Sequence, residues 1–294
     1  MKPVSDFQSI LKPRPKKIHK RQLGHILVVA GSYHMSGAAS LTALAALRSG
    51  VGLITMSYPE RLERIFRKTI LEAMHLPLPE NRQGSISSSA YKNIKKEFKK
   101  YDLMIIGPGL SRSKSTEVFC KSVISRVDLP MVIDADALNA LADLKLTDKI
   151  LKNRTAATVL TPHHGEMERL INKKIPDDLN ERQRIVKKYS GEWNAHIVLK
   201  GYRTIIGSPQ GVVKIDQHGG PVLATAGSGD VLSGILGTLV VQNIKETFKA
   251  CCVAVHLHSL TGSLAAKDLG EKSVIASDLI NYIPSGFDIL SKIR

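Results

Sequence analysis

Short apolar runs alternate with amphipathic stretches along most of the chain. The first such pair is HILVVAG at 25–31, which predicts a buried strand, followed by an Ala- and Leu-rich helix at 37–50. Similar apolar runs predict further strands at 51–57, 102–109, 130–138, 156–166 (running into a turn and a helix), 196–200, 203–207 and 211–216. Helices are predicted near 60–69 and at 91–100, 228–241, 245–268 and 277–290. Continuous apolar strands separated by helices are typical of an α/β fold, with a mostly parallel central sheet and helices on both faces.

No internal repeat or long linker interrupts this alternation. We therefore predict a single domain over 23–294, preceded by a basic N-terminal segment at 1–22 that concentrates lysine and arginine. The whole chain has a formal net charge of +16, which favours anionic partners such as nucleic acids or phosphorylated small molecules. It lacks zinc-finger spacing and basic segments interleaved with aromatic residues, so we expect no nucleic acid partner.

The chain has no run of the roughly 18 consecutive apolar residues that predict a membrane-spanning helix. The basic first segment also lacks the uninterrupted apolar stretch of a secretory signal. The whole chain has three cysteines, which are too few for a disulfide framework, and two of them, Cys251 and Cys252, are adjacent. We therefore expect a cytoplasmic protein with reduced thiols and no membrane partner.

Glycine-rich or polar segments follow several of the predicted strands. They read GSYHMSGAA, GPGL, DADALN, TPHHGE and KGYRT. Any one of them is accounted for as a simple turn. In open parallel sheets, however, ligands bind beyond the carboxyl ends of the strands. Five such segments in one chain predict a single composite cleft.

The stretch ATAGSGDVLSG at 224–234 places three small residues and a carboxylate at the start of a predicted helix. The backbone N–H groups of Gly227, Ser228 and Gly229 would form an anion hole at the positive end of that helix. Asp230 follows directly and would take a proton from an attacking hydroxyl. Phosphoryl transfer needs mainly positioning, charge stabilisation and one group that orients the nucleophile. The alternative is that Asp230 is only a favourable charge in a first helical turn.

Two further groups of residues are candidates for metal binding. Asp134 and Asp136 are either acidic groups for Mg²⁺ or caps of the next helix, and we favour caps. The run CCVAVHLH places Cys252, His256 and His258 on nearby helical faces, a pattern more typical of a core helix than of a metal site. We therefore predict no protein metal site.

A longer set of motifs resembles one family. The segments are HKRQLGHILVVAGS, SGAASL, ALRSGVGLIT, IIGPGL, VIDADALN, TPHHGEMERL, VLKGYRTII and LATAGSGDVLSGI. In this order, over about 19–290, they resemble the ADP-dependent NAD(P)H-hydrate dehydratases of the ribokinase-like superfamily. That resemblance implies a repair enzyme that phosphorylates the ring hydroxyl of the S form of hydrated NADH or NADPH (NADHX, NADPHX). Elimination of phosphate then restores the dinucleotide.

The resemblance also implies roles for single residues. Asp230 resembles the catalytic base, in contact with the hydrated dinucleotide. Ala38, Gly109 and His163 resemble further contacts to that substrate, and His163 is alternatively a residue that only starts a helix. The ADP or AMP site implied by the resemblance comprises Gly229 and the strip Lys200, Gly201, Tyr202, Arg203 and Thr204. Lys200 is alternatively a solvated strand end.

The implied co-substrate is ADP, or ATP, with Mg²⁺. The resemblance further implies a homo-oligomer, a tetramer, and a separate epimerase for the other hydrate form. The chain departs from the family pattern at His218-Gly219-Gly220-Pro221, where the family usually has a Gly-Asn pair. The alternative function is that of a ribokinase-like kinase for a small vitamin alcohol of the thiazole or hydroxymethylpyrimidine type. An alternative from a different class is a basic nucleic-acid-binding protein, which explains the charge but not the strand-end glycines.

Overall fold

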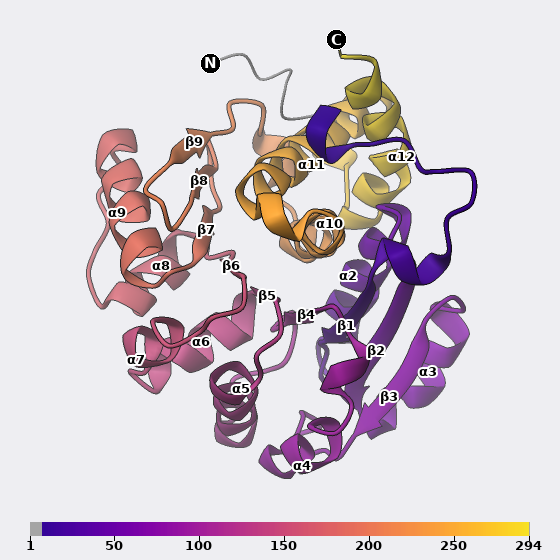
Figure 1. Ribbon diagram of the computed structural model, residues 1–294, viewed down its shortest axis with the longest axis vertical. Coiled ribbons are helices and arrows are strands. Elements are labelled where there is room, and N and C mark those ends of the chain that lie inside the picture. The colour runs from indigo at the N-terminus through magenta and orange to yellow at the C-terminus, as the bar shows by residue number, and fades with distance from the viewer. Residues whose placement is uncertain (1–7, 294) are drawn as a thin grey trace.

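The computed structural model describes residues 8–293, so residues 1–7 of the predicted basic segment lie outside the described residues. Within this range, one nine-stranded sheet has the order β3-β2-β1-β4-β5-β6-β7-β8-β9 (Figure 1). The strands are β1 (His25–Val29), β2 (Leu53–Pro59), β3 (Met74–Leu78), β4 (Leu103–Ile106), β5 (Met131–Ile133), β6 (Thr158–Leu160), β7 (His196–Leu199), β8 (Ile205–Gly207) and β9 (Val213–Ile215).

The sheet is parallel from β3 to β7, and β8 and β9 continue it as antiparallel strands at one edge. Strand β1 is buried at every residue, as expected for a strand covered on both faces. The chain runs from β1 outward to β3 and then returns to add β4 on the other side of β1. The sheet therefore has a topological switch point between β1 and β4, where α/β folds form their ligand crevices.

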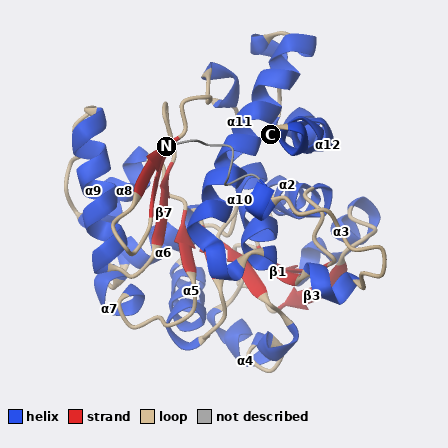
Figure 2. Cartoon of the chain, turned by 45° about the horizontal axis from the view of Figure 1, so that its top comes forward, coloured by secondary structure: helices blue, strands red, loops and turns tan. Residues whose placement is uncertain are grey.

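Helices cover both faces of this sheet, and Figure 2 shows the strands passing between them. On one face of the sheet, the apolar side chains of a layer of helices pack against strand residues such as Ile26 and Val28. The helices of that layer are α2 (Ser36–Arg48), α3 (Glu63–Thr69), α10 (Ser228–Gln242), α11 (Thr247–Leu269) and α12 (Ala276–Lys292). The opposite layer contains α4 (Tyr91–Ile94), α5 (Lys114–Arg126), α6 (Ala135–Asp143), α7 (Thr147–Leu151), α8 (His164–Ile171) and α9 (Leu179–Glu192). The predicted α/β class, mostly parallel with helices on both faces, is confirmed.

Several predicted elements differ from the structure. The strand expected at 130–138 ends at Ile133, because Asp134 caps a helix that begins at the next residue. The helix expected at 91–100 is only one turn, followed by a separate 3-10 turn at Phe98–Lys100. Strand β3 was not predicted. It is an edge strand that contains Pro77 and leaves Met74 exposed, so it lacks the continuous apolar pattern of the inner strands.

The described part of the basic N-terminal segment packs against the rest of the chain. Ile10 is buried within the core on the α10 and α12 side. Asn243 donates a hydrogen bond to the Ile10 carbonyl at 3.4 Å, and the Arg14 guanidinium donates to the Gly50 carbonyl at 2.6 Å. Among residues 8–293, no helix is both long and apolar enough to cross a membrane.

Candidate active site

The switch point between β1 and β4 brings two of the predicted substrate contacts together. The Gly31 N–H after β1 donates to the Pro108 carbonyl after β4 at 2.8 Å. Gly109 has φ +62°, and a Cβ there would lie 2.9 Å from the Cβ of Ala38. Ala38 and Gly109 are therefore neighbours, and only glycine fits at the second position. Beside them is a cavity of about 500 Å³, lined by Ser32, His34, Met35, Gln83, Ser85, Ser111, Arg112 and Ser113.

A second cavity, of about 480 Å³, opens between the β7–β9 edge and helices α10 and α11. Most of the predicted nucleotide residues line it, as do Gly219, Gly220 and Pro221 from the segment that departs from the family pattern. Arg203 does not line this cavity: it has φ +56°, and its guanidinium lies over the Tyr202 ring, 5.3 Å from the centroid. The predicted residues lining the cavity are Lys200, Gly201, Tyr202, Thr204, Ser228 and Gly229.

The start of helix α10 closes this second cavity. Gly227 is its N-cap, with φ +87°, and no side chain caps the helix. The first N–H groups of a helix have no partner within it, so those of Gly229 and Asp230 are available to an anion. The Ser228 N–H instead donates to the Thr225 carbonyl at 3.3 Å. Of the three predicted anion-hole residues, Ser228 is thus the one whose amide is already used.

His258 of α11 holds the first turn of α10 in place by a hydrogen bond. It is buried, and burial lowers its pKa to about 4, so the imidazole is neutral at physiological pH. Its Nε2 lies 3.0 Å from the Ser228 carbonyl oxygen, to which it donates as the protonated ring nitrogen. The buried His258 therefore has a structural role, as expected for a core helix.

Asp230 has the ionisation behaviour expected of a general base. Burial, together with repulsion from the nearby Asp134 carboxylate, raises its pKa to about 7, although Lys200 opposes the shift. A base is most effective when its pKa lies near the working pH. A carboxylate that only complements the helix dipole would not require burial beside another carboxylate. This environment therefore favours the interpretation of Asp230 as a general base.

Lys200 and Asp134 form a buried ion pair beside this base. The Lys200 Nζ lies 2.8 Å from Asp134 Oδ1, and the Lys200 side chain is only 19% exposed. Burial opposes both charges, yet their mutual attraction holds the pKa of Asp134 below its usual range and that of Lys200 above it. Lys200 is therefore not a solvated strand end.

Both oxygens of Asp134 are engaged by protein donors. Oδ1 also accepts from the Ala135 N–H at 2.9 Å, and Oδ2 accepts from the Ser233 hydroxyl at 2.7 Å. Asp134 caps helix α6, as favoured from the sequence. Asp136 lies in the first turn of the same helix and accepts from the Ser111 N–H at 2.8 Å.

His163 lies three residues after β6, next to Lys200, with which it forms a parallel β-bridge. It caps α8 through its side chain and pairs with Glu166 in a capping box. Burial, and then the charge of Lys200, lower the pKa of His163, so its ring is neutral at physiological pH. His163 therefore does start a helix, as one of the two interpretations predicts. Its ring is half-exposed at the edge of the cleft, and its contact with the substrate stays a prediction.

Three residues shape the site in ways that were not identified from the sequence. Ser233 lies one helical turn after Asp230, a spacing that places both on one face of α10. Glu166 lies three residues after His163, the spacing of a capping box. His258 gave no such local signal, because its partner Ser228 is 30 residues away in the chain.

We expect Gly229→Ala to weaken ADP binding about tenfold while leaving the melting temperature unchanged or higher. Alanine favours the helix by about 1 kcal/mol, but its Cβ would lie 3.3 Å from Lys200 Nζ, where a phosphate must approach. Gly37→Ala is the matched control, because it is also the second residue of a helix and its Cβ meets open space. Calorimetric titration with ADP measures the effect. Equal affinities for Gly229→Ala and the wild type would contradict a phosphate cradle, that is, an anion hole formed by the N–H groups at the start of α10.

Comparison with known proteins places this site in context. The family model for NAD(P)H-hydrate dehydratase matches residues 26–285. The bifunctional NAD(P)H-hydrate repair enzyme Nnr of Moorella thermoacetica is 40% identical over 278 residues, which cover 94% of this chain and 52% of that protein. The Gloeobacter violaceus enzyme of the same name is 37% identical, with 86% and 48% covered. The chain thus spans about half the length of the curated relatives it matches.

Solved structures agree with this comparison. The ADP/ATP-dependent NAD(P)H-hydrate dehydratase of Bacillus subtilis, co-crystallised with ATP and Mg²⁺, has a TM-score of 0.78 and 26% identity, with 97% of each chain covered. A ribokinase-like superfamily protein of Enterococcus faecalis has a TM-score of 0.82 at 24% identity, covering 99% of this chain and 95% of that one. The ribokinase-like fold predicted from the motifs is confirmed.

Proposed function

Since the chain belongs to the NAD(P)H-hydrate dehydratase family, we propose that it dehydrates the S form of hydrated NADH and NADPH with ADP or ATP as the phosphoryl donor. The family resemblance predicted from the motifs is confirmed by the family model and the relatives. The observation that carries the proposed activity is the environment of Asp230. This residue is a carboxylate with a pKa of about 7 beside an uncapped helix start.

In the proposed reaction, the ring hydroxyl of the hydrated nicotinamide attacks the terminal phosphorus of the nucleotide, and Asp230 accepts the hydroxyl proton. The bond between that phosphorus and its bridging oxygen breaks, so ADP leaves as AMP, or ATP as ADP. The phosphate ester then leaves as inorganic phosphate with loss of one ring proton, which restores the double bond. The N–H groups at the start of α10 and the positive end of that helix stabilise the phosphate oxygens.

The two cavities divide the substrates between them. We assign the nucleotide to the cavity lined by Lys200, Gly201, Tyr202, Thr204 and Gly229. We assign the hydrated dinucleotide to the cleft that starts at Ala38 and Gly109 at the switch point and extends along the strand ends toward His163 after β6. Leu41 of α2 packs against the start of α10, since a Cβ on Gly227 would lie 2.5 Å from Leu41 Cδ1. The two sites therefore meet at the first turn of α10, where Asp230 lies.

We propose that Mg²⁺ enters only as an ion bound to the nucleotide phosphates. A dedicated protein site for Mg²⁺ needs free oxygen ligands, usually carboxylates. Both oxygens of Asp134 are engaged by Lys200, Ala135 and Ser233, and Asp230 is half-protonated near pH 7. These residues do not fit a resident magnesium ion, so we derive no step through it.

The alternative, a kinase for a small vitamin alcohol, would use the same cradle and base but would stop after phosphorylation. A hydroxyethylthiazole kinase of Pyrococcus horikoshii has a TM-score of 0.60 at 14% identity, which reflects a shared fold alone. The matching family model favours the dehydratase.

The experiment is turnover of hydrated NADPH with ADP by the full chain, followed as recovery of NADPH absorbance. Steady recovery with formation of AMP and phosphate supports the dehydratase. Consumption of ATP and a thiazole or pyrimidine alcohol, without recovery of NADPH, would establish the kinase instead.

Further properties stay proposals. We propose a cytoplasmic homo-oligomer, a tetramer, made of a single domain over 23–294 with a basic segment at 1–22. The relatives in the comparison are named bifunctional, which describes those proteins.

A further inference from the structure

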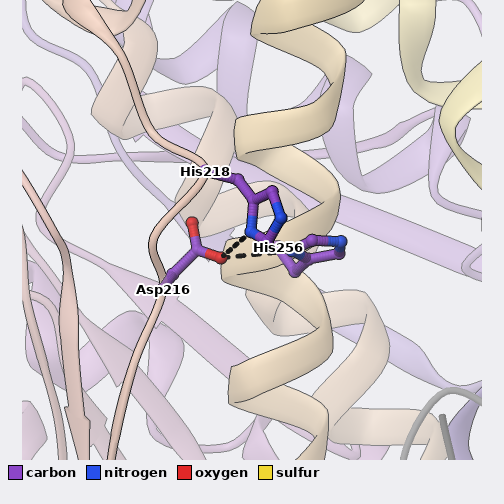
Figure 3. A group of neighbouring side chains, drawn as sticks. All are labelled: Asp216, His218 and His256. Carbon is purple, nitrogen blue, oxygen red and sulfur yellow. Dashed lines mark hydrogen bonds and ion pairs between the residues drawn. The ribbon is translucent and has the colours of Figure 1, made fainter. Parts of the chain in front are cut away.

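Two histidines and an aspartate converge next to the nucleotide cavity. Asp216 and His218 follow strand β9, and His256 projects from helix α11 toward them (Figure 3). Asp216 Oδ1 lies 3.1 Å from His256 Nδ1 and 3.4 Å from His218 Nδ1. Within residues 8–293, this is the one group of three or more His, Cys, Asp or Glu side chains whose ligand atoms all lie within 4.8 Å of one another.

The separations match the edges of a metal coordination polyhedron. Zinc binds imidazole nitrogen and carboxylate oxygen at about 2.0–2.2 Å, so neighbouring ligand atoms in a tetrahedral site lie about 3.3 Å apart. The two distances from Asp216 Oδ1 are close to this value. A small closure between the two imidazoles, whose rings lie edge to face with centroids 4.4 Å apart, would complete three ligands around one ion.

The second oxygen of Asp216 is held in place by the protein. The Ser259 hydroxyl donates to Asp216 Oδ2 at 2.6 Å, and Asp216 is buried, with a side chain only 6% exposed. Hydrogen bonds of this kind orient a ligating carboxylate. The first oxygen, Oδ1, is thereby directed toward both histidines.

The donor set determines which ion fits. Imidazole nitrogen suits Zn²⁺, Co²⁺ and Ni²⁺, whereas Mg²⁺ prefers oxygen ligands. The His218 side chain is 64% exposed, so a fourth position beside it is open to water. This site is therefore different in chemistry from the magnesium that accompanies a nucleotide.

We propose that Asp216, His218 and His256 bind one divalent transition-metal ion of the zinc type, which ties the segment after β9 to helix α11. Each imidazole binds through Nδ1 as a neutral ring protonated on Nε2. Gly219 and Gly220, which follow His218, and Ser259, which holds Asp216, all line the nucleotide cavity. The metal would thus fix one wall of that cavity.

From the sequence, His256 was considered as a ligand only together with Cys252 and His258, and that group was judged more typical of a core helix. Cys252 and His258 lie near it on the same helix, but the ring of His258 turns inward to Ser228. The two other ligands come from a segment about 40 residues earlier in the chain, and one of them, His218, is the first residue of the segment that departs from the family pattern. Only the fold brings them together.

The test is calorimetric titration of the full chain, stripped with a chelator, with zinc chloride. We expect one equivalent to bind, with an affinity at least about tenfold lower in both His218→Gln and His256→Gln. His164→Gln is the matched control, because His164 is also partly exposed and lies 3.7 Å from a carboxylate, that of Glu168. It should bind zinc as the wild type does.

Thermal unfolding gives a readout that does not depend on activity. A metal that binds only the folded state raises the melting temperature. Zinc should raise that of the wild type and of His164→Gln, but not that of His218→Gln, whose exposed side chain is not needed for folding. Absence of stoichiometric zinc binding by the wild type, or equal zinc affinity in the wild type and His218→Gln, would overturn the proposal and leave the three residues as a hydrogen-bond network.

Discussion

Asp230→Asn is expected to lower turnover of hydrated NADPH with ADP by about 10²- to 10⁴-fold, the range typical of a lost general base. Asparagine is nearly isosteric, so the cradle and both cavities should persist and ADP binding should survive. If the variant retains more than about a tenth of wild-type turnover, Asp230 is not the base.

The pH profile tests the same assignment independently. The base must be deprotonated to act, so kcat/KM should rise with pH through about 7 and level off above it. An aspartate without these neighbours would place that limb near pH 4. Asp136→Asn is the matched control: it removes a carboxylate that also raises the pKa of Asp230, so it should retain turnover and move the limb to lower pH.

Stability should respond in the opposite direction to activity. The pKa of Asp230 is raised from 3.8 to about 7 on folding, so between these pH values the folded state holds a proton that the unfolded chain has released. The free energy of unfolding therefore falls as pH rises from about 4 to about 7 and changes no further above that range. The shift corresponds to on the order of 4 kcal/mol of unfolding free energy. Asp230→Asn removes a buried charge, so we expect it to melt above the wild type at pH 8 and close to it at pH 4.

The local part of this site is predictable from the sequence. Gly227, Gly229 and Asp230 lie within four consecutive residues, and the helix that begins there is rich in apolar residues. The glycine and polar segments after the inner strands are predictable as one cleft, because parallel strands end at the same edge of the sheet. Strand β3 was missed since it is a short edge strand interrupted by a proline.

The contacts that tune the chemistry are not predictable in this way. Lys200 and Asp134 are 66 residues apart, at the ends of β7 and β5 on either side of β6. From the sequence, Lys200 was interpreted as a nucleotide contact and Asp134 as a helix cap. Neither interpretation indicated that the two side chains form an ion pair. Asp230 acquires its raised pKa from burial and from the carboxylates of Asp134 and Asp136, which lie about 100 residues earlier in the chain and meet it only in the fold.

Lys200→Met is therefore expected to destabilise the fold as well as to weaken nucleotide binding. It leaves the Asp134 carboxylate buried, with a side chain 1% exposed and no counter-charge, which typically costs about 3–5 kcal/mol. Asp134→Asn removes the counter-charge that lies 2.8 Å from Lys200 Nζ and is also expected to destabilise the fold. The double variant buries no unpaired charge at this pair, so it should recover most of the unfolding free energy that either single variant loses.

Urea unfolding of the four proteins measures this coupling as a double-mutant cycle. All three variants should bind ADP more weakly than the wild type, because Lys200 lines the nucleotide cavity and Asp134 holds it there. Additive losses of stability would mean that the two charges do not depend on each other. Full recovery of stability without recovery of ADP binding would instead separate the two roles of Lys200: its charge is balanced by Asp134 for folding, and its Nζ is directed to the helix start for the phosphate.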